Sequence, residues 1–250
     1  MLTSRVLLSC FLRSYLIGAA FTMRGLQIIG FIYAMQCGLD ALYPDAEARR
    51  EAYQRYMPTY NSHPFWAPLL VGIFLSLEQR VAQGSLPPAV FLKVKDTTVY
   101  TLSAIGDSLF GGTILVAWSL TSCALLIAQF YTAAALFTLI PFILLQLFRL
   151  ACFILGYREN LAVLQRIKKL RLMELSDYIK VYNAIILAIL MYLAWPHNAF
   201  ASTSMQAIWW LWSVLFMGIF SYALQRFPTA RIYIIMCAIM GIACLSVISG

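Results

Sequence analysis

Charged side chains are scarce in this 250-residue chain, in which Asp, Glu, Lys and Arg together make up 11% of the residues. Hydrophobic residues make up 62%, the mean hydropathy is +0.80, and residues 108–148 contain no charged side chain. This composition excludes a water-soluble globular protein and indicates an integral membrane protein, with room for about five to seven bilayer-spanning helices of ~20 residues. The net charge of +8 fits basic cytoplasmic loops. Because no dense basic patch carries interleaved aromatic residues, we expect no nucleic-acid partner.

The common motifs of catalysis and metal binding are also missing. The sequence has no HExxH zinc pair, no GxSxG nucleophile turn and no glycine-rich loop ending in Gly-Lys. Its six cysteines form no CxxC pair and lie mostly in apolar runs, which predicts buried thiols rather than a metal site or a disulfide framework. We therefore expect no catalytic residue, no metal ion and no cofactor. The apolar run after Arg5 meets Arg13 too early for a signal peptide.

The residues that are present predict an all-α, polytopic integral membrane protein with three regions. Residues 1–60 form an amphipathic N-terminal helical region, 61–97 a re-entrant segment with a loop, and 98–250 a transmembrane helical domain. In the first region, Arg5, Arg13, Arg24 and Gln27 fall within an arc of about 100° on one helix. This stripe predicts an interfacial helix whose arginines reach the lipid head groups, with a substrate-lining role as the alternative. The mixed charges of residues 46–51 predict a solvent-exposed helix.

The second region combines a short apolar run with turn-forming residues. Residues 65–77 are apolar, but 13 residues are too few to cross a bilayer, so we expect a re-entrant or half-buried helix. Gly84, Pro87 and Pro88 then mark a turn or loop within residues 81–92.

The third region carries the predicted spans, at residues 99–128, 131–155, 182–195, 205–224 and 232–247, about five transmembrane helices in all. The first span is long or broken, and Pro141 is expected to kink the second. Residues 158–180 carry six basic and three acidic side chains, the largest basic excess of any connection. The distribution of basic residues therefore places 158–180 and 226–231 in the cytoplasm, and 128–131, 196–204 and the C-terminus outside.

Two carboxylates are expected at membrane depth, Asp107 and Glu78. Asp107 adjoins the uncharged stretch and lies between Gly106 and the pair Gly111-Gly112. A charge at the bilayer centre costs roughly 2.5–3.5 kcal/mol on insertion scales, so such residues are rare and usually face a polar interior. Three roles remain open for Asp107: hydrogen bonds to sugar hydroxyls, ion or proton coupling, or bonds to backbone amides freed by a glycine break.

We interpret both histidines of the chain, His63 and His197, as structural residues. His63 precedes the re-entrant candidate, and its chemistry would suit a base or a phosphate acceptor. We favour a helix-start residue instead, because Asn61 and Ser62 beside it are also capping residues. His197 lies in a predicted outer loop and is interpreted as structural.

Four segments, at residues 15–27, 30–35, 61–65 and 104–110, occur in the order and at the spacing found in one known family. Together they resemble the IID component of the mannose/fructose/sorbose family of the bacterial phosphotransferase system. The resemblance is clearest over residues 10–160. The chain departs from the usual pattern of that family at Ile28, Gln79, Arg80 and Gly111.

This resemblance implies a non-phosphorylated subunit of a sugar phosphotransferase complex in the bacterial cytoplasmic (inner) membrane. Its partners would be an obligatory IIC membrane subunit, which completes the translocation unit for a mannose-type hexose, and the IIA and IIB phosphocarriers. A higher-order oligomer of IIC–IID units is also implied, with the lipid bilayer around it.

The resemblance also implies two groups of site residues. Gln27, Asn61 and His63 would lie near the IIC interface, and Glu78, Asp107 and Ser108 would bind the sugar or lock broken helices. The alternative is a stand-alone secondary transporter that uses Asp107 for ion coupling.

Overall fold

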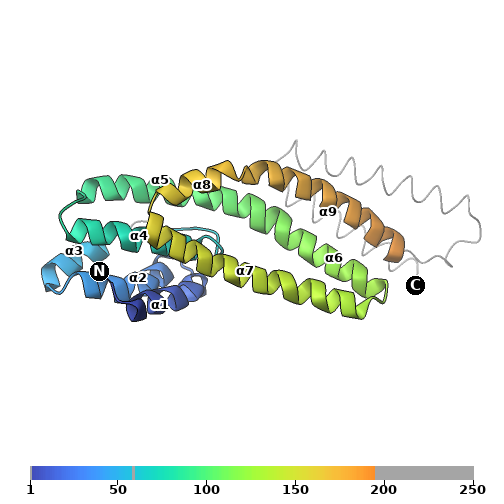
Figure 1. The fold of residues 1–250 in the computed structure, drawn as a ribbon, viewed down its shortest axis with the longest axis horizontal. Coiled ribbons are helices and arrows are strands. Elements are labelled where there is room, and N and C mark those ends of the chain that lie inside the picture. Colours follow the sequence, from blue (N-terminus) through green and yellow to red (C-terminus); the bar gives the residue numbers. More distant parts are fainter. Residues whose placement is uncertain (1, 58–59, 195–250) are drawn as a thin grey trace, which may run out of the picture. The chain divides into compact units, whose positions relative to one another are not determined.

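The computed structural model describes residues 2–57 and 60–194, and every regular element within these two ranges is a helix (Figure 1). In chain order the helices are α1 (Ser4–Arg13), the 3-10 helix η1 (Ser14–Ala19), α2 (Ile28–Leu42), α3 (Ala46–Gln54), α4 (Ala67–Ala82), α5 (Pro88–Gly106), the π-helix η2 (Asp107–Ile114), α6 (Leu115–Ile127), α7 (Tyr131–Glu159), α8 (Ala162–Lys169) and α9 (Leu172–Ala194). The predicted all-α class is confirmed for this part of the chain.

Helices α1 to α4, with η1, form an N-terminal lobe around α4 (Figure 1). Every residue of α4 from Ala67 to Leu75 is buried, because apolar side chains cover its whole circumference rather than one stripe. Within the chain α4 is therefore a core helix, and its re-entrant placement in a bilayer stays a prediction. The exposed helix expected at 46–51 is present as α3, which starts where the Asp45 carboxylate accepts a 2.9 Å hydrogen bond from the Ala48 N–H.

The start of the chain is not the single helix on which the basic stripe was predicted. Helix α1 ends at Arg13, and the backbone at Leu26 is left-handed, with φ of 57°. The hydroxyl of Thr22 accepts a hydrogen bond from the N–H of Gly25, a local turn that competes with helix formation. The predicted stripe is therefore wrong: Gln27 is buried in the lobe and precedes α2, whereas Arg13 ends α1.

Helices α5, η2 and α6 run on as one continuous helix of 40 residues, and α7 returns beside α6 (Figure 1). Pro88 opens this helix, a position that proline tolerates because the first N–H of a helix has no intrahelical partner. The loop predicted at 81–92 is therefore shorter, and the boundary predicted at residue 97 falls inside α5. Where a break was expected around Asp107, the helix widens into the π form over Asp107–Ile114.

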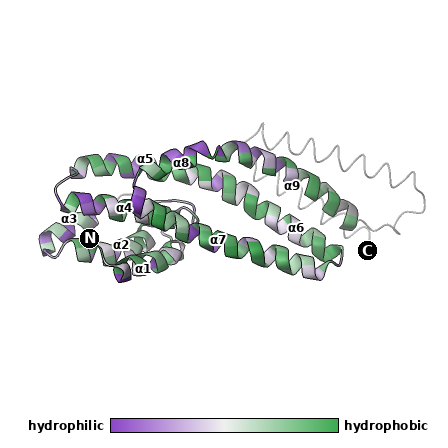
Figure 2. Ribbon diagram, in the orientation of Figure 1, coloured by the Kyte–Doolittle hydropathy of each residue, from purple (hydrophilic) through white to green (hydrophobic). Residues whose placement is uncertain are grey.

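The helices α6 and α7 of the hairpin are mostly hydrophobic along their length (Figure 2). Two helices, Pro88–Ile127 and Tyr131–Glu159, are long and apolar enough to cross a membrane. Large apolar side chains along α7, such as Leu136, Phe142 and Leu147, are about half exposed, which suits contact with lipid or another membrane protein. The predicted spans 205–224 and 232–247, the connections at 196–204 and 226–231, His197 and the C-terminus lie outside the described residues.

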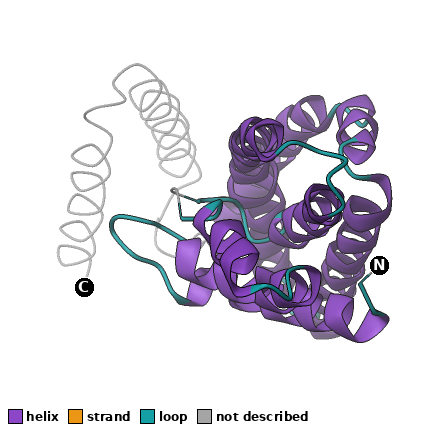
Figure 3. Cartoon of the chain, turned by 90° about the vertical axis from the view of Figure 1, so that its left-hand side faces the viewer, coloured by secondary structure: helices purple, strands orange, loops and turns teal. Residues whose placement is uncertain are grey.

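The lobe and the hairpin meet where α4 crosses α7 (Figure 1). Figure 3 shows the described elements, all of them helices or loops, from the lobe side. A Cβ atom on Gly156 of α7 would lie 2.6 Å from the carbonyl oxygen of Leu69 on α4. In the same way, a Cβ atom on Gly72 of α4 would collide with the backbone of Phe153 on α7. Each glycine thus removes the side chain that would separate the two backbones, as small residues do where membrane helices pack closely.

Candidate functional site

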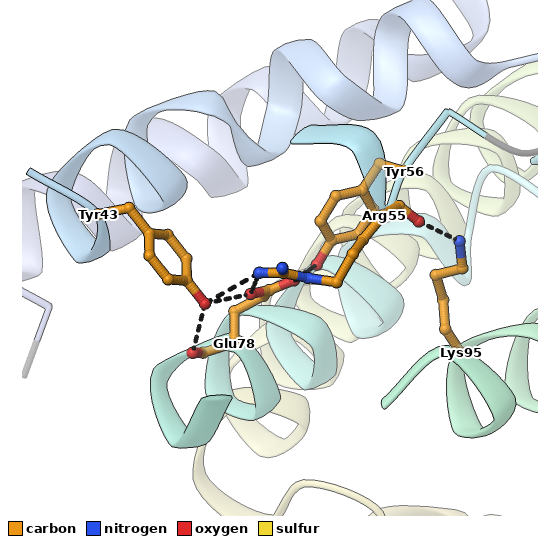
Figure 4. Close-up of polar contacts among 5 residues, drawn as sticks. All are labelled: Tyr43, Arg55, Tyr56, Glu78 and Lys95. Carbon is orange, nitrogen blue, oxygen red and sulfur yellow. Dashed lines mark hydrogen bonds and ion pairs between the residues drawn. The ribbon is translucent and has the colours of Figure 1, made fainter. Parts of the chain in front are cut away.

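Glu78 on α4 is fully buried and accepts hydrogen bonds from three side chains (Figure 4). Arg55 donates through Nε to Oε1 at 3.1 Å and through Nη2 to Oε2 at 2.7 Å, a two-point ion pair. The hydroxyls of Tyr43 and Tyr56 donate to Oε2 at 2.7 Å and to Oε1 at 3.0 Å. Lys95 on α5 donates in turn to the carbonyl oxygen of Arg55 at 2.6 Å. We call these five residues the Glu78 cluster.

Burial and the neighbouring Glu78 keep the two tyrosines of the Glu78 cluster protonated. Burial, followed by the charge of Glu78, raises the pKa of Tyr56 well above its ordinary value. Burial and the hydrogen bond to Glu78 raise the pKa of Tyr43 in the same direction. Both phenols therefore remain donors at neutral pH. Arg55 supplies two donors and the two tyrosines one each, and these four occupy about all the acceptor sites of one carboxylate. The geometry therefore favours the role predicted for Glu78 of locking helices over bonds to sugar hydroxyls.

The other predicted site residues lie where the lobe meets the π-helix, and we call Gln27, Asn61, His63, Asp107 and Ser108 the junction cluster. The side-chain oxygen of Gln27 accepts from the N–H of Ser62 at 3.2 Å, and its own N–H donates to the carbonyl of Tyr60 at 2.9 Å. Gln27 thereby fixes the loop that carries Asn61 and His63.

His63 is held against the π-helix by its ring and its backbone. Its ring stacks on Phe110 of η2, with centroids 5.3 Å apart, and a Cβ atom on Gly106 would collide with the His63 side chain. Its Nδ1 lies 3.4 Å from the N–H of Phe65, and its carbonyl accepts from the N–H of Trp66 at 2.9 Å at the start of α4. Burial lowers the pKa of His63, and the negative charge of Asp107 partly offsets this. The ring is therefore mainly neutral at pH 7, and the role of His63 as a helix-start residue stays a prediction.

Asp107 and Ser108 open the π-helix and differ in their surroundings. Asp107 is exposed, and no basic side chain of the described residues lies within ion-pair distance of it. Ser108 is half-buried, with its hydroxyl 3.2 Å from that of Ser176 on α9. Ser176 also donates to the carbonyl of Ser108 at 3.4 Å, and Asn183 on α9 donates to the carbonyl of Thr113 at 3.1 Å.

Ser176 and Asn183 were not predicted as functional residues. A π-turn leaves carbonyls without regular helical partners, and these two buried side chains supply donors to them. A signal was present in the sequence, since the two polar residues are spaced seven apart on α9 and so share one face of the helix.

A small cavity of about 170 Å³ adjoins both clusters. It combines aromatic faces with an amide, an ammonium, a carboxylate and a hydroxyl. Its lining includes Phe31, Tyr60, Tyr100, Asn61, Lys95, Asp96 and Ser103. The cavity places rings that can stack on the flat faces of a sugar beside polar groups that can bind its hydroxyls. Neither Lys95 nor Asp96 was predicted from the sequence as a site residue, so the cavity adds them to the candidate residues. Within residues 2–57 and 60–194, no three His, Cys, Asp or Glu side chains are grouped to hold a metal ion.

Comparisons with known proteins agree on one family. The profile described as "PTS system mannose/fructose/sorbose family IID component" matches residues 1–247. The mannose-specific EIID component of Escherichia coli K12 is 30% identical over 152 residues, which cover 60% of this chain and 52% of that protein. The fructose permease IID component of Bacillus subtilis is 25% identical over 181 residues, which cover 70% of this chain and 64% of that protein. The matched region thus spans about half the length of the mannose-specific relative.

Two solved structures share the fold. A chain of the mannose transporter ManYZ in complex with microcin E492 superposes with a TM-score of 0.54 at 22% identity, covering 98% of this chain and 97% of that one. A second chain, described as a membrane protein, superposes with a TM-score of 0.70 at 24% identity over the same shares. At these identities the likeness concerns the fold.

Proposed function

This chain belongs to the IID component family of the mannose/fructose/sorbose phosphotransferase system, and from that premise we propose that it forms, with a IIC subunit, the translocation unit for a mannose-type hexose. The match over residues 1–247 is the observation that carries this proposal. The comparisons give no support to a stand-alone ion-coupled transporter. In the proposed complex, IIA and IIB modules supply the phosphate, and this chain takes none itself.

The junction cluster and the small cavity support a role in holding sugar. Asp107 is an exposed acceptor without an ion-pair partner in the described residues, so its oxygens are open to hydroxyl donors. Asn61 lines the cavity with its amide, and aromatic rings flank it. His63, neutral and wedged against η2, positions this surface without taking phosphate.

The proposed orientation places the basic connections in the cytoplasm. Helix α8, with Arg166, Lys168 and Lys169 in its last turn, follows the end of α7 at the lobe end of the hairpin, whereas the turn at 128–130 forms the opposite tip (Figure 1). Lys93 and Lys95 are in the first half of α5, which precedes the hairpin. One orientation therefore places these basic residues on one side of the membrane and the uncharged tip on the other.

The test is sugar uptake in cells that supply IIA and IIB, with this chain and its IIC partner expressed singly and together. We expect uptake only when both membrane chains are present, and co-purification of the two. We expect Asp107→Asn to reduce uptake at least tenfold while co-purification persists, because the amide replaces one acceptor with a donor. The matched control is Asp177→Asn on exposed α9, where the carboxylate bonds only Lys180 among the described residues.

Uptake by this chain alone would overturn the proposed function. Normal uptake by Asp107→Asn at equal expression would remove Asp107 from the path and leave the family assignment in place.

A further inference from the structure

Arg149 is a buried guanidinium on α7, one of the two helices of the described residues that are long and apolar enough to cross a membrane. It is 9% exposed, and its Nε has no hydrogen-bond partner within these residues. Its contacts are aromatic: Cζ lies 3.6 Å from the ring centroid of Tyr15 and 5.9 Å from that of Phe65. The hydroxyl of Tyr15 is itself fixed by a 3.0 Å bond to Gln146, one turn before Arg149 on α7. Stacking on rings orients a guanidinium but satisfies none of its N–H donors.

No carboxylate side chain of this chain can neutralise Arg149. The ten acidic residues all lie in the described ranges, and none has an oxygen within 4.0 Å of an Arg149 nitrogen. The remaining residues, 1, 58–59 and 195–250, contain no Asp or Glu. A buried charge without a counter-charge is strongly unfavourable, and an anion from another molecule would remove that cost.

The depth of Arg149 along α7 indicates which anion is available. It lies 18 residues after Tyr131, a rise of about 27 Å along the helix, close to the ~30 Å thickness of a hydrocarbon core. With the hairpin tip at one membrane surface, Arg149 therefore reaches the level of the head groups at the other surface. The chain neighbours of Tyr15 and Arg149 include exposed leucines, Leu16 at 51% and Leu150 at 39%, which suit acyl chains.

We propose that Arg149 binds the phosphate of a phospholipid in the leaflet on the lobe side of the membrane. A guanidinium presents paired N–H groups that match two phosphate oxygens, and the Tyr15 and Phe65 rings hold it in that direction. A lipid phosphate lies at this depth without the burial of a second protein charge, which a carboxylate from another subunit would require. Because this is the leaflet that faces the basic connections, anionic lipids such as phosphatidylglycerol are the expected class.

The experiment measures phosphatidylglycerol bound to the delipidated full-length chain in detergent, by native mass spectrometry across a lipid titration. We expect one saturable site, and at least tenfold weaker binding in Arg149→Met. Arg13→Met is the matched control, since Arg13 also stacks on a tyrosine, with Cζ 4.4 Å from the Tyr33 centroid, but donates to Gln36 and to a backbone carbonyl. Its affinity should stay within twofold of the wild type.

A second measurement uses the wild-type chain alone and so does not depend on a folded variant. A galactosyl diacylglycerol, which has the acyl chains but no phosphate, should fail to displace phosphatidylglycerol. Equal displacement by the galactolipid, or unchanged binding in Arg149→Met, overturns the proposal. Loss of a co-purifying subunit from Arg149→Met with unchanged lipid binding also overturns it, and assigns the counter-charge to a protein carboxylate.

Discussion

The Glu78 cluster should stabilise the lobe rather than contact the transported molecule, and Arg55→Met tests this directly. Methionine keeps much of the aliphatic stem but leaves the fully buried Glu78 carboxylate with two tyrosine hydroxyls as its only side-chain donors among the described residues. Removing one partner of a buried ion pair costs about 3–5 kcal/mol. For a chain of this size, 1 kcal/mol shifts the unfolding temperature by roughly 2–4 °C. The expected fall is therefore about 6–20 °C.

The assay is heat-induced unfolding of the purified full-length chain in detergent, followed by tryptophan fluorescence, for Arg55→Met, Glu78→Gln and the double variant. Glu78→Gln strands a guanidinium whose side chain is 9% exposed, so we expect a loss of similar size. The double variant removes both charges and should be less destabilised than the sum of the single variants by at least ~1 kcal/mol.

Two results would refute the reasoning about Glu78. The first is an unfolding temperature of Arg55→Met within 2 °C of the wild type, which on the scale of roughly 2–4 °C per kcal/mol means almost no stabilisation. The second is a Glu78→Gln variant of normal stability that no longer transports sugar, which would return Glu78 to the translocation path.

The remaining predictions concern the helix crossing and His63. Gly156→Ala should lower the unfolding temperature strongly, because its Cβ would meet the Leu69 carbonyl oxygen at 2.6 Å. The control is Gly84→Ala, which has open space around it but a φ of +73° and should cost about 1 kcal/mol. Equal effects of the two substitutions would contradict the close crossing of α4 and α7. The pKa of His63 is lower in the folded chain than its ordinary value of 6.5, so the unfolded chain binds more protons as the pH falls below that value. The free energy of unfolding should therefore fall as the pH drops below 6.5 and level off below the folded pKa. His63→Gln should flatten this slope, and an unchanged slope would count against burial of His63 as its cause.

Local patterns in the sequence were sufficient for some parts of the fold. Hydropathy identified the helices now seen as α6 and α7, and the mixed charges of residues 46–51 identified the exposed helix α3. These features depend on residues close together in the chain, so composition and spacing report them directly.

The parts that failed depend on contacts between distant residues. Arg55 and Glu78 are 23 residues apart, and nothing in the spacing shows that the charge of Glu78 is neutralised inside the lobe. The continuous stripe containing Gln27 failed because a turn at Thr22 and a pairing with the loop at Tyr60 compete with helix formation. Helix continuation through Asp107 as a π-turn depends on donors from α9, 68 or more residues later in the chain.

The crossing of α4 and α7 has a mechanical consequence for how the lobe and the hairpin can move. Backbones in direct contact leave no side chains between them that could change rotamer and absorb a displacement. Sliding one helix along the other would carry each glycine out of register and bring the bulkier Leu69 or Phe153 into its place. The crossing therefore acts as a pivot: it resists translation, and a tilt of the lobe is passed to α7 as a rotation about Gly72 and Gly156.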